Sequence, residues 1–180
     1  MKNLILCLSA LVLINTANLN AQDEETRINF FDAEFFLVEE DYRDALLAYL
    51  KVYDAGYEDN ANINYRIGIC YLNIPGEKSK SIPYLEKAII SLTDNYREGS
   101  FKEEEAPYDA LLFLGNAYRI NNQLDKAIET YDQYIELFDD AESEEVIYAN
   151  QQIAACNRAK EAIKNPVRLE LENLGAGYNS

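Results

Sequence analysis

Small residues recur beside large ones at a fixed helical spacing along this 180-residue chain. The clearest copy is Leu114-Gly115, followed by Tyr118 on the same predicted helix and by Ala127 and Tyr131 on the next. A small residue in this position lets a neighbouring helix approach closely. Helix pairs of this kind bury their apolar faces by stacking on one another. The register therefore predicts a helical solenoid in place of one globular core.

Two further copies extend this pattern to three helix hairpins. The second copy joins Ile67-Gly68 and Tyr71 to Ser81, Leu85 and Ala88, and the first, weaker copy joins Ala33 and Phe36 to Ala45 and Tyr49. Hairpin helices are expected over 28–38, 42–55 and 124–138, and Pro107 is expected in the first turn of the helix that carries Gly115. A last helix is predicted from Ser143, a candidate N-cap, to Lys164, with Pro166 after it.

Residues 22–165 resemble the tetratricopeptide repeat (TPR) family, whose unit has about 34 residues. The residues of the third copy that match the family's pattern in register are Leu111, Leu114, Gly115, Tyr118, Ala127 and Tyr131. The resemblance implies an all-α fold, a right-handed α-solenoid of about three TPR hairpins plus a C-terminal capping helix. It also implies a non-catalytic scaffold that binds another protein.

The N-terminal segment, residues 1–21, has the pattern of a secretory signal peptide. Lys2 supplies a positive charge, an apolar run covers Leu4 to Ile14, and Ala21 is a small residue at a plausible cleavage point. A membrane anchor is the alternative, but spanning a bilayer takes about 20 apolar residues. A lipid anchor at Cys7 is disfavoured because Leu6 precedes it. We therefore expect a periplasmic protein, with outer-membrane association as an extension of that prediction.

The C-terminal tail, residues 166–180, changes from a helical to an alternating pattern at Val167, Leu169 and Leu171. This tail is similar to the segment after the TPR region of gram-negative envelope proteins that also carry a β-propeller and an OmpA-like domain. Some members of that group belong to the type IX secretion machinery. Two interpretations stay open: a truncated relative of such a protein, or a short extended arm.

Charge and residue usage disfavour several classes of function. The formal net charge is −16, so phosphate groups of nucleic acids and of anionic lipids are repelled. The chain has no histidine, which removes histidine-activated nucleophiles and imidazole metal ligands, and it has no Gly-rich phosphate loop. No enzyme activity, cofactor or metal site is predicted. Cys70 and Cys156 are expected to be free thiols, and the acidic run 139–145 is expected to be a solvated turn.

The spacing between copies is uneven. Ala33 and Gly68 are 35 positions apart, whereas Gly68 and Gly115 are 47 apart. The additional residues fall in a polar segment around 93–106, which we call the insert. One interpretation is a longer second helix followed by a flexible loop. The other is a binding loop that reaches over the groove.

The first helices of successive hairpins line the concave groove in this fold. The residues that the register directs to it are apolar, aromatic or amide-bearing, which suits a peptide anchored on aromatics and held through its backbone. An alternative is a glycan-binding envelope protein that uses some of its 14 tyrosines. The predicted groove residues are Phe30, Glu34, Leu37, Asn62, Tyr65, Ile69, Asn73, Asp109, Leu112, Asn116 and Arg119.

Overall fold

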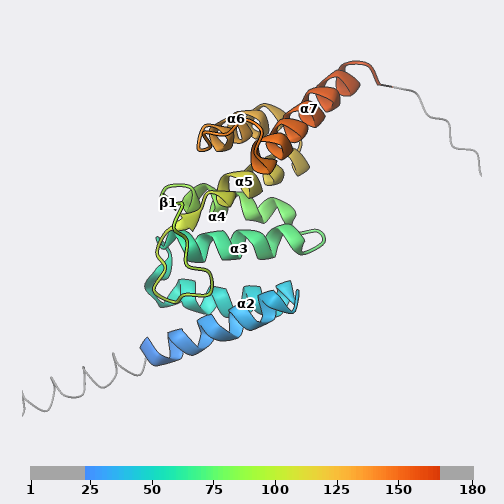
Figure 1. Ribbon diagram of the computed structural model, residues 1–180. Coiled ribbons are helices and arrows are strands. Elements are labelled where there is room, and N and C mark those ends of the chain that lie inside the picture. The colour runs from blue at the N-terminus through green and yellow to red at the C-terminus, as the bar shows by residue number, and fades with distance from the viewer. Residues whose placement is uncertain (1–22, 167–180) are drawn as a thin grey trace, which may run out of the picture.

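A computed structural model describes residues 23–166, and these form a stack of antiparallel helices (Figure 1). The predicted signal peptide and nearly all of the predicted tail lie outside the described residues. The N-terminal helix covers residues 23–38. The later α-helices are α2 (Tyr42–Val52), α3 (Ala61–Asn73), α4 (Ser81–Ala88), α5 (Asp109–Ile120), α6 (Leu124–Ile135) and α7 (Glu144–Lys164).

Polar side chains cap three of these helices where the sequence turns. The Asp41 carboxylate accepts from the Asp44 N–H before α2, and the Asn60 side chain accepts from the Ile63 N–H before α3. Ser143 caps α7 by accepting from the Val146 N–H at 3.3 Å, which confirms its predicted role. After α2 the chain makes a π-turn, Tyr53–Tyr57, in which Gly56 has a φ of 106°.

The small residues of the repeated register lie at the closest helix crossings. A methyl group on Gly68 would lie 2.5 Å from Cγ of Leu85, and one on Gly115 would lie 2.5 Å from Cε1 of Tyr131. Ala33 occupies the same place in the first hairpin and is completely buried. The three predicted hairpins are therefore present, and their helices are held together at the predicted positions.

The helix α3 lies between two groups of buried side chains. Ile63, Ile67 and Cys70 pack with the first hairpin, whereas Tyr65 and Leu72 pack with the third. One helix thus joins both ends of the stack, and no separate globular core is formed. Cys70 and Cys156 are free and buried, as predicted.

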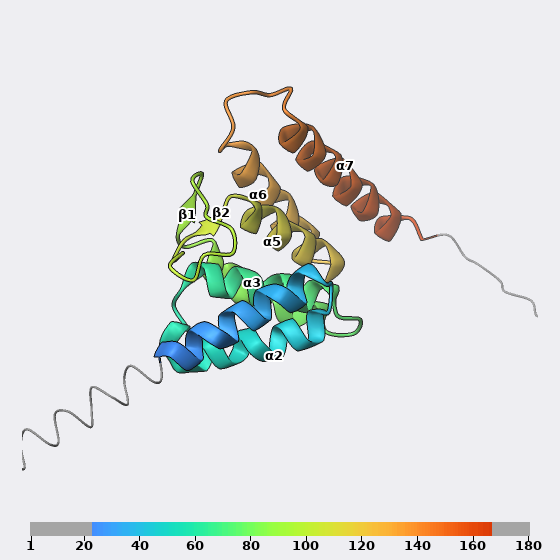
Figure 2. The same ribbon diagram turned by 60° about the horizontal axis from the view of Figure 1, so that its bottom comes forward.

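A single helix forms the outer layer at each end of the stack. The N-terminal helix is its outer layer at one end, and α7 covers α6 at the other (Figures 1 and 2). The position of α7 agrees with the predicted capping helix. No helix within residues 23–166 is long and apolar enough to cross a membrane.

Two expectations for the region between the second and third hairpins are wrong. The helix α4 ends at Ala88, so the additional residues do not lengthen it. Pro107 belongs to a two-residue strand, β2 (Ala106–Pro107), which pairs in parallel with β1 (Leu92–Thr93), and α5 begins only at Asp109. A proline has no N–H to donate, so it is tolerated at the edge of so short a sheet.

Candidate functional site: a groove partly filled by the insert

The insert lies across the concave surface of the first two hairpins, so the second of its two predicted interpretations is closer to the structure. The segment between β1 and β2 crosses the N-terminal part of α3 toward the N-terminal helix (Figure 1). It occupies the groove that it was expected to reach over.

Tyr96 is the main contact of the insert with the middle of the groove. Its ring packs edge-on against Tyr65, with centroids 6.2 Å apart, and its hydroxyl donates to Oδ1 of Asn62 at 2.5 Å. Burial raises the pKa of Tyr96 to about 12, so the hydroxyl keeps its proton and remains a donor. Asn62 is 1% exposed, and Tyr65 is 7% exposed.

The backbone of the insert caps the N-terminus of α3. The N–H groups of Ala61 and Asn62 both donate to the carbonyl oxygen of Glu104, at 3.0 and 3.4 Å, and the Asn60 amide donates to the carbonyl of Glu103. The first N–H groups of a helix have no partner within it. The insert supplies that partner from more than 40 residues away in sequence.

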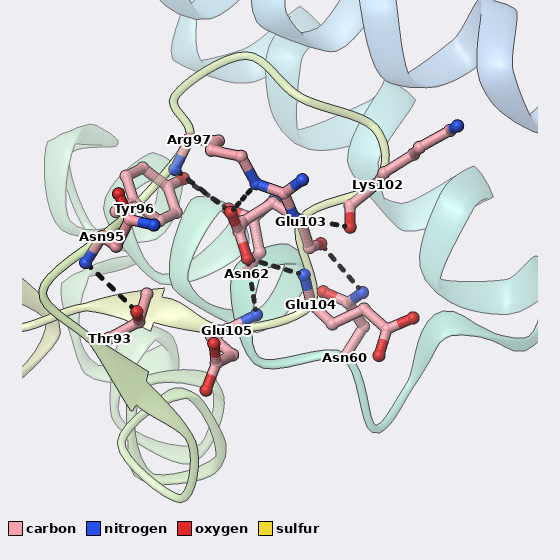
Figure 3. Close-up of polar contacts among 10 residues, drawn as sticks. All are labelled: Asn60, Asn62, Thr93, Asn95, Tyr96, Arg97, Lys102, Glu103, Glu104 and Glu105. Carbon is pink, nitrogen blue, oxygen red and sulfur yellow. Dashed lines mark hydrogen bonds and ion pairs between the residues drawn. The ribbon is translucent and has the colours of Figure 1, made fainter.

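Glu103 holds the insert in shape and is itself 3% exposed (Figure 3). Its carboxylate accepts from Nε of Arg97 at 2.9 Å and from the backbone N–H groups of Arg97, Glu104 and Glu105. Burial alone would raise the pKa of Glu103, but the hydrogen bonds from Arg97 and from the backbone outweigh it and keep that pKa below its usual value.

Phe101 fills the end of the groove at the N-terminal helix. Its ring lies 5.4 Å from that of Phe30 and 5.6 Å from that of Tyr57, measured between centroids. Phe30 is 1% exposed as a result of this packing. Three of the predicted groove residues, Phe30, Asn62 and Tyr65, are thus in contact with the chain's own insert and are not accessible to a partner in this conformation.

A buried arginine joins the first hairpin to the insert. Nε of Arg66 lies 3.2 Å from Oε1 of Glu34, and Nη1 lies 3.7 Å from Oε1 of Glu98 on the insert. Glu34 also accepts from the hydroxyl of Tyr49 at 2.5 Å. The Arg66 side chain is 5% exposed, yet its Nη2 has no hydrogen-bond partner. Its guanidinium lies over the rings of Tyr65 and Tyr96, 5.9 and 5.8 Å from their centroids, so aromatic faces replace part of the missing hydrogen bonding.

The other predicted groove residues on α3 and α5 are at least partly exposed to solvent. Ile69, Leu112, Asn116 and Arg119 are half-buried on α3 and α5, and Asn73 and Asp109 are exposed. The hydroxyl of Tyr131 donates to Oδ1 of Asn116 at 2.8 Å, and that of Tyr134 donates to Oδ1 of Asp109 at 2.9 Å. These two hydrogen bonds hold the side chains of Asn116 and Asp109 in place on α5. Glu34 and Leu37 are also half-buried, beside the insert. We call Ile69, Asn73, Leu112, Asn116 and Arg119 the open groove.

The tyrosines mostly serve packing. Within residues 23–166, Tyr148 is the one tyrosine with more than a third of its surface exposed, at 43%. Several other tyrosine hydroxyls donate a hydrogen bond to a residue of another helix, as that of Tyr118 does to Oε1 of Glu86 at 2.6 Å. The described residues therefore present no row of exposed tyrosine rings on which a sugar would stack.

The acid groups of the described residues do not gather into a cation site. No group of three or more Cys, Asp or Glu within residues 23–166 has the geometry to hold a metal ion. Burial raises the pKa of Cys70 to about 12, which keeps this thiol protonated and unreactive at neutral pH.

Comparison with known proteins supports the fold. No protein-family model matches the chain, and no curated protein matches its sequence. Its structure is similar to the crystal structure of the Sgt2 TPR domain from Aspergillus fumigatus, with a TM-score of 0.57 and 16% identity, over 87% of this chain and 94% of that one. The fold is a TPR-type α-solenoid. The MamA protein is a weaker match, with a TM-score of 0.36 and 22% identity, over 83% of this chain and all of that one.

At 16% identity, the likeness to the Sgt2 TPR domain shows the fold alone. The sequence analysis did not identify the residues of the insert that contact the predicted groove residues. Tyr96, Phe101 and Glu103 lie in a polar, acidic segment without periodicity, and only the aromatic residues within that segment are a signal that part of it is buried.

Proposed function

We propose that the protein is a non-catalytic scaffold of the cell envelope that binds a partner protein or peptide through its concave face. The observation that carries this proposal is that the concave face already holds a non-helical segment of chain, the insert. It does so through an aromatic anchor, Tyr96, and through main-chain hydrogen bonds to Glu104. Aromatic anchors and main-chain hydrogen bonds are also the contacts that hold a bound peptide.

The partner is proposed to occupy the open groove. Leu112 and Ile69 provide apolar contacts, and Asn116 is held by the hydroxyl of Tyr131. Arg119 is partly exposed and adds a positive charge. The open groove therefore has apolar side chains together with an amide and a cation that a partner could contact.

The envelope location is proposed from the two ends of the sequence. Residues 1–21 have the pattern of a signal peptide, and residues 166–180 are similar to the segment that follows the TPR region in envelope proteins with OmpA-like domains. We place the protein in the periplasm, in an assembly at the outer membrane such as the type IX secretion machinery.

A photo-crosslinking amino acid in place of Leu112 tests the open groove. Irradiated in the envelope of the source organism, this variant is expected to capture one defined partner, identified by mass spectrometry. The matched control carries the same amino acid in place of Leu47, an exposed residue of α2 outside the groove. Capture of the same proteins from both positions would contradict a partner site at Leu112.

The location has its own test. The protein recovered from the periplasmic fraction is expected to begin at Gln22, as read by N-terminal sequencing. A cytoplasmic protein that retains Met1 would disprove export but would leave the scaffold function standing.

A further inference from the structure

The N-terminal helix carries an exposed apolar stripe. Ile28, Phe31, Phe35 and Val38 follow one another at steps of three, four and three, which places them on one face of the helix. Their exposed fractions are 52%, 45%, 61% and 79%. The opposite face buries Phe30 and Ala33 against the first hairpin. The stripe is therefore additional to what the fold needs, and apolar surface of this kind marks interaction sites.

Two clefts border this stripe on the side of the insert. The first, of about 830 Å³, is lined by Phe31, Tyr57 and Phe101 among others. The second, of about 560 Å³, is lined by Phe35, Val38 and Arg66 with their neighbours. Gly99 at the tip of the insert lines both, so the two clefts meet there. The lining of the first cleft also includes Arg27, Lys102 and Glu104, so it is mixed in polarity, whereas the second is mainly apolar.

The rim of the stripe is acidic. Glu24, Glu25, Asp32 and Glu39 are exposed on the N-terminal helix and the turn after it, and Glu98 is exposed on the insert. Arg27 is the nearby cation on this helix, and its guanidinium lies 5.6 Å from the centroid of the Phe31 ring. Acidic groups thus outnumber basic ones around the stripe, in a chain whose net charge is already −16.

Arg66 adds no free cation to this face. It lines the second cleft, but its side chain is 5% exposed and pairs with Glu34 and Glu98. Its guanidinium also lies 5.9 and 5.8 Å from the ring centroids of Tyr65 and Tyr96. With two carboxylates beside one guanidinium, the second cleft carries a net negative charge.

We propose that this face, made of the apolar stripe and its two clefts, binds a basic amphipathic helix of a partner protein. Apolar side chains of that helix enter the clefts beside Phe31 and Phe35, and its lysines or arginines face the acidic rim. The inference rests on the proposed scaffold function and adds a second surface with its class of partner. A second copy of this chain fits poorly, because it would bring the same acidic rim against this one.

A synthetic peptide of leucine and lysine, arranged to form one apolar face as a helix, is the probe. Its binding is measured by fluorescence anisotropy at about 0.15 M salt, where long-range attraction between charges is screened. A peptide of the same composition in an order without an apolar face controls for charge alone. The purified protein is expected to bind the first peptide and to bind the second much more weakly.

Two variants locate the binding. Phe35→Asp is expected to weaken binding of the amphipathic peptide by at least about tenfold. Leu47→Asp changes a residue with the same 61% exposure outside both clefts and is expected to bind as the wild type does. Circular dichroism checks that both variants remain folded. Two results would overturn the proposal: an equal loss of peptide binding in both variants, or equal binding of the two peptides by the wild type. Either result would mean that basic peptides are attracted non-specifically to an acidic protein.

Self-association is the competing outcome. Sedimentation that shows a dimer in the wild type and a monomer in Phe35→Asp would overturn the proposal in favour of an interface between copies. Phe35→Asp, made in the protein that carries the crosslinking amino acid at position 112, separates this surface from the open groove, because it is expected to weaken peptide binding and keep the captured partner. A wild-type protein that binds no amphipathic peptide while partner capture is intact would reject this inference and leave the scaffold function standing.

Discussion

Replacing Gly115 by alanine is expected to destabilise the third hairpin, although alanine is the better helix former. The added methyl group would lie 2.5 Å from Cε1 and 2.7 Å from Cδ1 of Tyr131. This ring is fully buried, and its hydroxyl donates to Asn116 at 2.8 Å, so it cannot move aside without losing that bond. Overpacking costs about 1–3 kcal/mol and the lost hydrogen bond about 1 kcal/mol. Alanine returns about 1 kcal/mol in helix propensity, which leaves a net loss of about 1–3 kcal/mol.

Urea unfolding followed by far-UV circular dichroism measures this loss as a lower midpoint at an unchanged slope. Gly68→Ala is the matched comparison, since its methyl group would meet the flexible Leu85 side chain, which no hydrogen bond holds. We expect Gly68→Ala to lose less stability than Gly115→Ala. Tyr131→Phe in the Gly115→Ala background should cost less than it does alone, because the ring is then free to shift. A Gly115→Ala protein as stable as the wild type would refute the reasoning.

Four further predictions concern the insert, the buried titratable groups and the cap of α7. Glu103→Gln should speed amide exchange of the insert while exchange of α3 beyond its first turn is kept, whereas Glu105→Gln, at an exposed residue, should not speed exchange of the insert. Equal exchange in both variants would contradict the role of Glu103. The pKa of Glu103 lies below its usual value, so its stabilisation is present at neutral pH and is lost as pH falls through that lowered pKa, which acid-dependent exchange of the insert should detect. Burial raises the pKa values of Cys70 and Tyr131 to about 12, from usual values of 9.0 and 10.0. The unfolded chain therefore loses these protons at lower pH than the folded protein does, and the urea midpoint should fall as pH rises above the usual values. A urea midpoint that stays constant up to about pH 12 would contradict this prediction. Ser143→Ala should lower the stability of α7 by about 1 kcal/mol, measured by urea unfolding, and an unchanged midpoint would mean that the cap contributes nothing.

The helices and their crossings could be predicted from the sequence because their signals are local. Gly68 and Gly115 recur with large residues at helical spacing, and Ser143 precedes an apolar helix at capping distance. Each of these signals can be recognised within a stretch of sequence about as long as one helix. The same reasoning placed Cys70 and Cys156 in different repeats, and the structure shows both as free thiols.

The insert could not be placed in this way because its contacts are distant in sequence. Tyr96 meets Asn62 across 34 residues, and Asn60 meets Glu103 across 43. Glu103 stands in a row of three glutamates, of which it alone is buried. Nothing in the composition of that row distinguishes the buried carboxylate from its exposed neighbours, since the difference arises from the backbone turn that surrounds it.

The pairing of Leu92 with Ala106 means that the chain leaves the solenoid and returns to it at one point. Residues added between the contacts that hold the segment in place cost little, since each doubling of loop length costs only about 0.6 kcal/mol. The segment between β1 and β2 can therefore be lengthened or changed in sequence at its tip, as long as Tyr96, Phe101 and the Glu104 carbonyl keep their contacts with the hairpins. A protein built in this way can change what its concave surface recognises while the architecture that presents that surface stays constant.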